Sequence, residues 1–294
     1  MQINPTRFNR RSISSHSLDS HLYAHWPLNE RTRYVHDCGP RNLDGFGSSP
    51  TTGIGELIGS ATWAIDPQRG GYVLSLPVFG SFVLFNSQFN NDQLFNITTG
   101  SFSATVWAKY STSYGNTWPA IIGKIKSQST TAGWGLNLNS SASGTPYIEI
   151  GDGSNTASAS WSTFVTDSQW HFHVVVLDRI AQVCKISIDG KPFVVGGSTA
   201  AVGSIDSTTA GFKIGCRPDG SGLQNCYNGF VSDVRLYRDI ALSQSAVTQL
   251  YQAGLIGDRV PNISNSRRFL SFLGTPDTAI FSTPMNRNRT YKIR

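Results

Sequence analysis

Glu149 and Asp152 lie three residues apart and are the first candidates for catalysis. A retaining glycoside hydrolase needs two carboxyl groups about 5–5.5 Å apart, one acting as nucleophile and the other as acid and base. In a regular strand, an offset of three residues places two side chains on opposite faces, and Gly151 and Gly153 indicate that the strand is already ending. A glucanase-like hydrolase is therefore the least favoured function.

Two histidines, His171 and His173, would share one face of a strand, a spacing that can hold a metal ion. Ordinary surface or edge positions are the favoured interpretation for both. The sequence has no Ser/His/Asp arrangement, no phosphate-binding glycine-rich loop and no CxxC zinc pair. We therefore expect a protein that is not an enzyme.

Three aromatic residues in Ser- and Gly-rich surroundings, Tyr114, Trp118 and Trp161, are candidates for glycan binding. An exposed ring offers a flat apolar surface that can stack on the apolar face of a sugar. A core or interface role is the alternative for each, and it is the favoured one.

Four cysteines leave two alternatives open. Cys216 and Cys226 flank a turn-rich stretch that could close as a hairpin and form a disulfide. The favoured alternative is four reduced, mostly buried thiols, because residues 1–20 have no apolar segment of the kind a secretory leader needs. No apolar run approaches the roughly 18 residues that span a bilayer, so we expect no membrane span.

The positive charge is concentrated at the two ends of the chain. The net charge is +6, of which residues 1–20 contribute +2 and residues 258–294 contribute +5, so residues 21–257 carry −1. The sequence thus predicts a globular body between two basic arms, whose arginines include Arg7, Arg10, Arg11, Arg267, Arg268, Arg287, Arg289 and Arg294. Basic arms favour an acidic partner, either another protein chain or nucleic acid; plain solubility is the alternative.

The body, residues 21–257, shows the period-2 alternation of strands. The predicted strands are residues 72–76, 82–85, 102–109, 133–138, 147–150, 170–177, 183–188, 191–195, 211–215 and 229–237. Asp189-Gly190 between two alternating segments predicts a tight hairpin turn, whereas residues 151–163 predict a loop or a weak edge strand.

Only residues 243–253 predict a helix, with Ser243 as N-cap and Gly254 as C-cap. Many short strands with one terminal helix favour an all-β, two-sheet antiparallel sandwich flanked by extended N- and C-terminal arms.

Several segments resemble, in the expected order, the laminin-G-like jelly-roll family of the concanavalin-A-like lectin/glucanase superfamily. They are HWPLNE (25–30), HDCGPRNLDG (36–45), FSATVWAK (102–109), WHFHVVVLDR (170–179), KISIDGKPF (185–193) and the segment 227–254. The resemblance covers about 230 residues and implies a jelly-roll sandwich. The basic arms have no counterpart in the family pattern.

The resemblance also implies a structural calcium site. In that superfamily, an acid at the place of Asp233 often binds calcium together with an acid and carbonyls near the first strand. Glu30, Asn42 and Asp44 would supply the remaining oxygen ligands here. The alternative is that Asp233 pairs with Arg235 or caps a turn.

These observations are compatible with three functions. The first is a non-enzymatic structural protein on the surface of a large assembly, such as a capsid decoration or attachment protein of a virus or phage particle, anchored by its arms. The second is a lectin-like, glycan-binding adhesion module, and the third is the hydrolase. The first would place the protein on a virion or another extracellular particle.

Overall fold

A computed structural model describes residues 18, 20–39, 54–85, 95–96, 100–111, 118–125, 131–139, 144–207, 210–219 and 222–259. Backbone contacts group the chain into two units, Met1–Val260 and Pro261–Arg294, and all described residues belong to the first unit. In the described part of the chain, no helix is long and apolar enough to cross a membrane.

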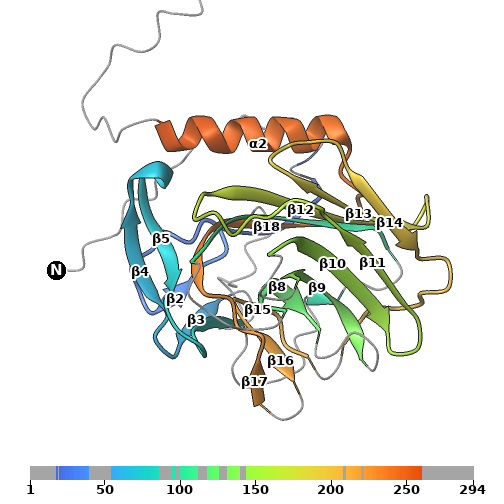
Figure 1. The fold of residues 1–294 in the computed structure, drawn as a ribbon, viewed down its shortest axis with the longest axis horizontal. Helices are drawn as coiled ribbons and strands as arrows, with labels where there is room; N and C mark the ends of the chain where they lie inside the picture. The colour runs from blue at the N-terminus through green and yellow to red at the C-terminus, as the bar shows by residue number, and fades with distance from the viewer. Residues whose placement is uncertain are drawn as a thin grey trace, which may run out of the picture. The chain divides into compact units, whose positions relative to one another are not determined.

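Two antiparallel eight-stranded sheets form the body, as predicted (Figure 1). In spatial order, sheet A contains β14 (Val194–Ser198), β13 (Val183–Ile188), β12 (His171–Asp178), β7 (Phe102–Tyr110), β18 (Gly229–Arg238), β5 (Gly71–Leu76) and β4 (Thr62–Asp66), and β1 (Leu22–Trp26) pairs with β18. Sheet B contains β11 (Thr156–Ser160), β10 (Pro146–Asp152), β9 (Ala132–Leu138), β8 (Ala120–Lys124), β15 (Lys213–Ile214), β6 (Phe82–Phe85), β3 (Gly55–Ile58) and β2 (Tyr34–Val35). Residues 151–163 therefore hold an edge strand, which was one of the two alternatives.

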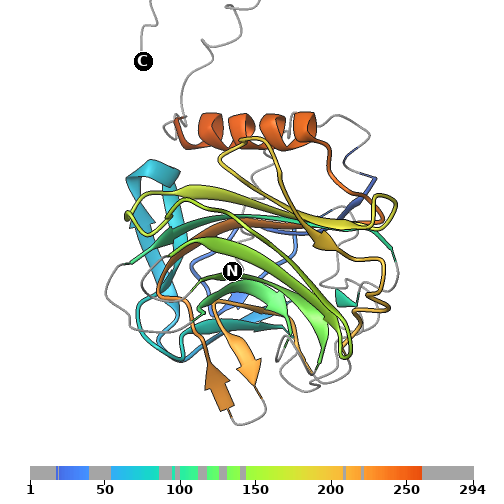
Figure 2. The ribbon, with the colours of Figure 1, turned by 45° about the vertical axis from the view of Figure 1, so that its right-hand side comes forward.

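A separate two-stranded hairpin, β16 (Arg217–Asp219) and β17 (Gly222–Gln224), projects from the sandwich on the side away from the helix (Figure 2). A disulfide between Cys216 and Cys226 joins its two ends. The favoured expectation of four reduced thiols was wrong for this pair, because β16 and β17 bring the two Cα atoms to 4.0 Å. Among the described cysteines, Cys38 and Cys184 form no disulfide.

The main core lies between the two sheets and is rich in aromatic rings. Trp26 of β1 contacts Phe85 at 4.7 Å and Phe212 at 5.4 Å between ring centroids, and Phe102 contacts Trp134 across the sandwich at 4.9 Å. Burial of each such side chain contributes about 1.5–3 kcal/mol, so this core holds the sheets together.

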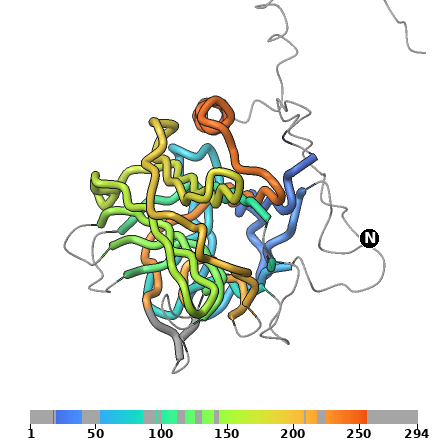
Figure 3. Tube along the Cα trace, turned by 90° about the vertical axis from the view of Figure 1, so that its right-hand side faces the viewer, coloured from blue at the N-terminus to red at the C-terminus, as the bar shows by residue number. Residues whose placement is uncertain are grey.

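A second apolar layer covers the outer face of sheet A. Trp107 and Phe172 of the sheet are buried there against Val247 of helix α2 (Gln244–Arg259), which Figure 3 shows end-on outside the sandwich. Ser243 caps the helix as predicted, with its hydroxyl accepting a hydrogen bond from Ala246 N at 3.3 Å. The expected C-cap at Gly254 was wrong.

Gly254 lies inside α2 because the helix passes directly over Trp107. A Cβ atom placed on Gly254 would lie 2.7 Å from Trp107 Nε1. The glycine therefore permits close packing of helix on sheet and does not end the helix.

The Asp189-Gly190 turn forms as expected, with φ of 54° and 70°, the positive values that this type of hairpin turn needs.

Candidate functional site

Asp233, the acid implied in calcium binding, lies at an irregularity of β18. The pairing of β18 with β7 shifts register between Ser232 and Arg235, and Asp233 itself has φ of 52°. Aspartate tolerates this left-handed conformation better than most residues. Asp233 N donates a hydrogen bond to Pro27 O at 3.1 Å, so the bulge fixes the carboxylate beside the end of β1.

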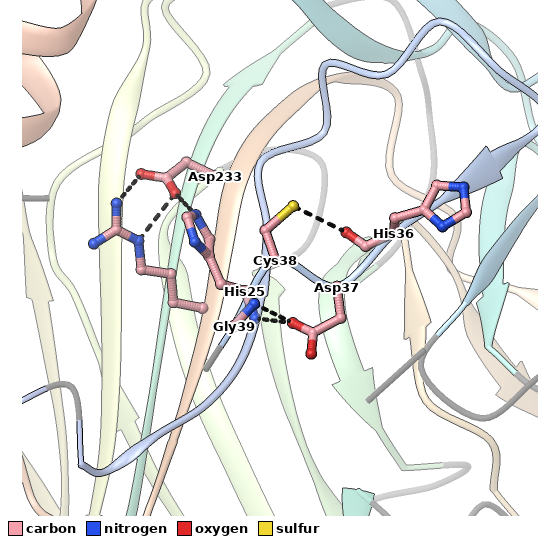
Figure 4. Close-up of polar contacts among 7 residues, drawn as sticks. His25, His36, Asp37, Cys38, Gly39 and Asp233 are labelled. Carbon is pink, nitrogen blue, oxygen red and sulfur yellow. Dashed lines mark hydrogen bonds and ion pairs between the residues drawn. The ribbon is translucent and has the colours of Figure 1, made fainter. Parts of the chain in front are cut away.

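Two basic side chains contact the Asp233 carboxylate. His25 Nε2 lies 2.7 Å from Asp233 Oδ1 (Figure 4). Arg235 forms a fork, with Nε donating to Oδ1 and Nη2 to Oδ2, both at 3.0 Å. Burial raises the pKa of Asp233, but the charge of Arg235 and the contact with His25 outweigh it and hold that pKa far below its usual range. Asp233 is therefore an ionised partner of Arg235.

The described donors do not make a calcium site around Asp233. Calcium takes six to eight oxygen ligands, whereas both oxygens of this carboxylate already face Arg235. Glu30 Oε1 accepts a 3.3 Å hydrogen bond from His36 N, and burial raises the pKa of Glu30. No group of three His, Cys, Asp or Glu side chains is placed to hold a metal within the described residues. Asn42 and Asp44 lie outside those residues, so the calcium site stays a prediction.

The turn after β2, at residues 37–39, is hydrogen-bonded to β1. Asp37 is buried, and its Oδ1 accepts hydrogen bonds from His25 N at 2.7 Å and Gly39 N at 2.9 Å (Figure 4). Cys38 N donates to His25 O at 2.7 Å. These contacts give Asp37 a structural role and hold His25 in position for Asp233.

A second cluster occupies the outer face of sheet B, on strands β8 to β11. Along β9 and β10, Leu136 and Ile148 belong to the main core. Since side chains alternate between faces, Asn137, Tyr147 and Glu149 point outward from the same strands. On the edge strand β11, the outward residues are the exposed Thr156, Ser158 and Ser160.

Glu149 anchors this cluster. Its Oε1 accepts hydrogen bonds from Arg217 Nη1 at 2.8 Å and Asn137 Nδ2 at 3.0 Å, and its side chain is 1% exposed. Burial raises the pKa of Glu149, against the charge of Arg217, which lowers it. Arg217 directly follows Cys216, so the disulfide places the guanidinium over β10.

Trp118 lies next to this cluster and is 42% exposed. Its ring meets the Tyr147 ring edge-on, with 5.6 Å between centroids. Trp118 has φ of 64° directly before Pro119, a conformation that costs about 1–3 kcal/mol for a residue other than glycine. A large exposed ring held in a strained backbone is a feature of binding sites.

Of the other two predicted glycan-binding aromatics, the structure describes one, and that one does not join Trp118. Trp161 is partly buried and packs against the main core, as its favoured core role implied. Tyr114 lies outside the described residues, as do the eight arginines named in the arms.

The two acids considered for catalysis are separated by the pleat. Glu149 belongs to the outer-face cluster, whereas Asp152 caps the turn that follows β10. Asp152 Oδ1 accepts hydrogen bonds from Ser154 N and Asn155 N at 2.7 and 2.6 Å, and its Oδ2 accepts one from Gly203 N at 2.7 Å. Neither acid is placed to act with the other on one glycosidic bond.

The expectation of a surface or edge position was wrong for His173. It is 1% exposed, because it shares a face of β12 with Val175 and Leu177, which belong to the main core between the two sheets. His171 lies between two carboxylates, with Nδ1 2.8 Å from Asp189 Oδ2 and Nε2 3.0 Å from Asp167 Oδ1. Burial lowers the pKa of His171, but the two carboxylates raise it more, so the net shift is upward.

The two antiparallel sheets pack face to face and define a jelly-roll β-sandwich. The candidate site lies on the outer face of sheet B, beside Trp118. Residues 86–248, more than half of the chain, match a laminin-G-like family model described as "Concanavalin A-like lectin/glucanases superfamily". The chain belongs to this superfamily, as the sequence resemblance implied. A search of curated protein sequences gave no match.

Solved structures share the fold at low sequence identity. The binding domain of botulinum neurotoxin serotype D matches with a TM-score of 0.55 and 15% identity, over 80% of this chain and 51% of the other. The binding domain of botulinum neurotoxin DC in complex with SialylT matches with a TM-score of 0.56 and 14% identity, over 81% of this chain and 52% of the other. Domain 4 of AbnA, an extracellular arabinanase from Geobacillus stearothermophilus, in complex with arabinotriose, matches with a TM-score of 0.53 and 16% identity, over 79% of this chain and 98% of the other. The chain thus spans about half the length of the neurotoxin domains.

Proposed function

We propose that the protein is a non-catalytic binding module that recognises glycans on the outer face of strands β8 to β11. The observation that carries this proposal is Trp118, an exposed ring held at positive φ against Tyr147. Such a ring can stack on a sugar, while Ser158 and Ser160 offer hydroxyl groups on the adjoining edge strand. Binding sites for small ligands commonly combine aromatic surface with a few fixed polar groups.

The comparisons support the same class of function. Among the structures of similar fold, one neurotoxin binding domain is in complex with SialylT and the arabinanase domain is in complex with arabinotriose. The neurotoxin structure is a binding domain, which agrees with the separation of Glu149 from Asp152. Because fold alone does not determine function, the proposal rests on the side chains around Trp118.

A glycan array probed with the wild type and Trp118→Ala tests the proposal. We expect the variant to lose about tenfold or more in affinity, the equivalent of one stacked ring. Phe164→Ala is the matched control, since Phe164 is 60% exposed and lies outside the outer-face cluster; it should bind as the wild type does. A folded wild type that binds no glycan would refute the proposal.

Thermal unfolding of the protein with calcium and with a chelator tests the predicted calcium site. A rise in Tm with calcium that is lost in Asp44→Ala would support a site formed by Asp44, Asn42 and Glu30. Identical melting curves under both conditions would refute it.

A second candidate function is attachment of this module to an assembly, such as the surface of a virus or phage particle. It is favoured by the charge distribution, with +7 on residues 1–20 and 258–294 together and −1 on the body. The Cys216–Cys226 disulfide suits an oxidising location such as a particle surface. Limited trypsin digestion of the isolated protein tests it: cleavage within both arms is expected, and full protection of the arms in a monomer would remove the argument.

A further inference from the structure

We infer that the outer-face site selects uncharged glycans over acidic ones, and that Glu149 sets this selectivity by neutralising Arg217. This inference deepens the proposed function and rests on it. It concerns the cluster of Asn137, Tyr147, Glu149 and Arg217 beside Trp118.

The positive charge of Arg217 is already paired. Its Nη1 lies 2.8 Å from Glu149 Oε1, and the two side chains are 10% and 1% exposed. An acidic sugar that drew Arg217 away would leave Glu149 buried without a cation, and a buried unpaired charge is strongly unfavourable. An anionic ligand that left the pair intact would instead approach a buried anion.

Other basic groups near these strands are engaged elsewhere. Lys213, on the neighbouring strand β15, lies over the Phe82 ring, 5.5 Å from its centroid. The residues of β8 to β11 are all described, and their single Lys or Arg is Lys124. Lys124 is buried and pairs in register with Trp134, which belongs to the main core. The outward side chains of β11 are uncharged hydroxyls.

Asn137 holds Glu149 in place beside Arg217. Its amide nitrogen donates to Glu149, and the Tyr147 hydroxyl also interacts with its side chain. Asn137 is fully buried, so it supports the ion pair from within and leaves contact with a ligand to Trp118 and the hydroxyl groups of β11.

These groups form one connected surface with the exposed ring. Asn137 and Arg217 pack together with Gly123 and Gly135, and the gap between them is too small for a water molecule. Tyr147 connects this packed cluster to Trp118: it contacts the Trp118 ring, and its hydroxyl interacts with Arg217 and Asn137. A sugar stacked on Trp118 would therefore present its hydroxyls toward a neutral ion pair.

Matched pairs of neutral and acidic glycans test the inference. The probes are lactose with 3′-sialyllactose and oligogalactose with oligogalacturonate, measured by calorimetry against the full chain. We expect the wild type to bind the neutral member of a pair more tightly. Glu149→Gln, which keeps the shape of the side chain but frees the charge of Arg217, should gain about tenfold for the acidic member.

The double variant Glu149→Gln/Arg217→Ala should lose that gain, because the freed cation is then absent. If Glu149→Gln does not fold, Ser158→Lys serves instead: Ser158 is exposed and pairs in register with Glu149, so it adds a cation to this face without disturbing the buried pair. It should also raise binding of the acidic member.

The outcomes separate the inference from the proposed function. A wild type that prefers the acidic members would overturn the inference but leave glycan binding intact. Unchanged acidic binding in both Glu149→Gln and Ser158→Lys would likewise overturn it. A wild type that binds no glycan on the wider array would overturn the proposed function, while an Arg217-dependent gain in Glu149→Gln would still support the role of Glu149.

Discussion

The buried His173 should make the protein lose stability as the pH falls below 6.5. The side chain is 1% exposed, and its Nδ1 has no hydrogen-bond partner within the described residues. Burial lowers the pKa of His173 to about 3, and the charge of the neighbouring His171 adds to the shift. The folded state therefore keeps this imidazole neutral over a pH range in which the unfolded chain protonates it.

The size of the effect follows from the two pKa values. Between pH 6.5 and about 3 the unfolded state binds one more proton than the folded state at His173, so the free energy of unfolding falls as the pH falls. Each pH unit in this window costs about 1.4 kcal/mol. The loss relative to pH 7.5 should be about 1.4 kcal/mol at pH 5.5 and about 2.7 kcal/mol at pH 4.5.

Urea unfolding of the wild type and His173→Leu at pH 7.5, 5.5 and 4.5 measures this contribution. Other groups, such as Asp167 and Asp189 with their lowered pKa values, also destabilise the folded state in acid, but they are present in both proteins. The stability of His173→Leu relative to the wild type should therefore rise by about 2.7 kcal/mol between pH 7.5 and 4.5.

Val175→Ala is the matched control for His173→Leu. Val175 is buried on the same face of β12, so its truncation should lower stability by a similar amount at every pH. Parallel pH profiles for His173→Leu and the wild type would refute the reasoning.

Three further changes test the packing and the charges. Gly254→Ala should destabilise the protein by about 1–3 kcal/mol despite the helix propensity of alanine, because the new Cβ meets Trp107; a raised urea midpoint would contradict this packing. Cys216→Ser/Cys226→Ser removes a cross-link over 10 positions and should cost about 2–3 kcal/mol, whereas equal midpoints with and without the disulfide would show that the hairpin adds nothing to stability. Asp233→Asn should lower the free energy of unfolding by about 2–4 kcal/mol, because it leaves Arg235 unpaired. Asp233→Ala should lower it by about 1 kcal/mol more, because alanine disfavours a φ of 52°. Variants as stable as the wild type would show that the pair does not stabilise the fold.

The strands and their inward faces could be predicted because the information is local. Alternation over residues 102–109 correctly separates Phe102, which enters the main core, from Trp107, which faces α2. The Asp189-Gly190 turn was predictable for the same reason, since two adjacent residues with positive φ define it.

The sites could not be predicted in the same way, because their partners lie far apart in the sequence. Arg217 reaches Glu149 across 68 residues, and His25 reaches Asp233 across 208. Neither pair can be predicted from the local alternation of polar and apolar residues. The YIEI alternation and the two cysteines around the hairpin were visible, and together they could have drawn attention to Glu149 and Arg217.

The burial of His173 shows the same limit. Alternation placed it on one face of β12, but only the packing of sheet B against that face, in the main core that contains Val175, decides that the histidine is buried.

The packing of the sheets and of α2 supports a glycan site on the outer face of β8 to β11. The inner faces of both sheets form the main core, and α2 covers Trp107 and Phe172 on the outer face of sheet A. On sheet B, Phe82 packs against the buried disulfide at the β6 side. The outer face of β8 to β11, with Trp118 at its margin, thus combines an exposed aromatic ring with fixed polar groups. Because Glu149 cancels the charge of Arg217 there, this face is suited to a ligand rich in hydroxyl groups and without net charge, and that combination is typical of a neutral glycan.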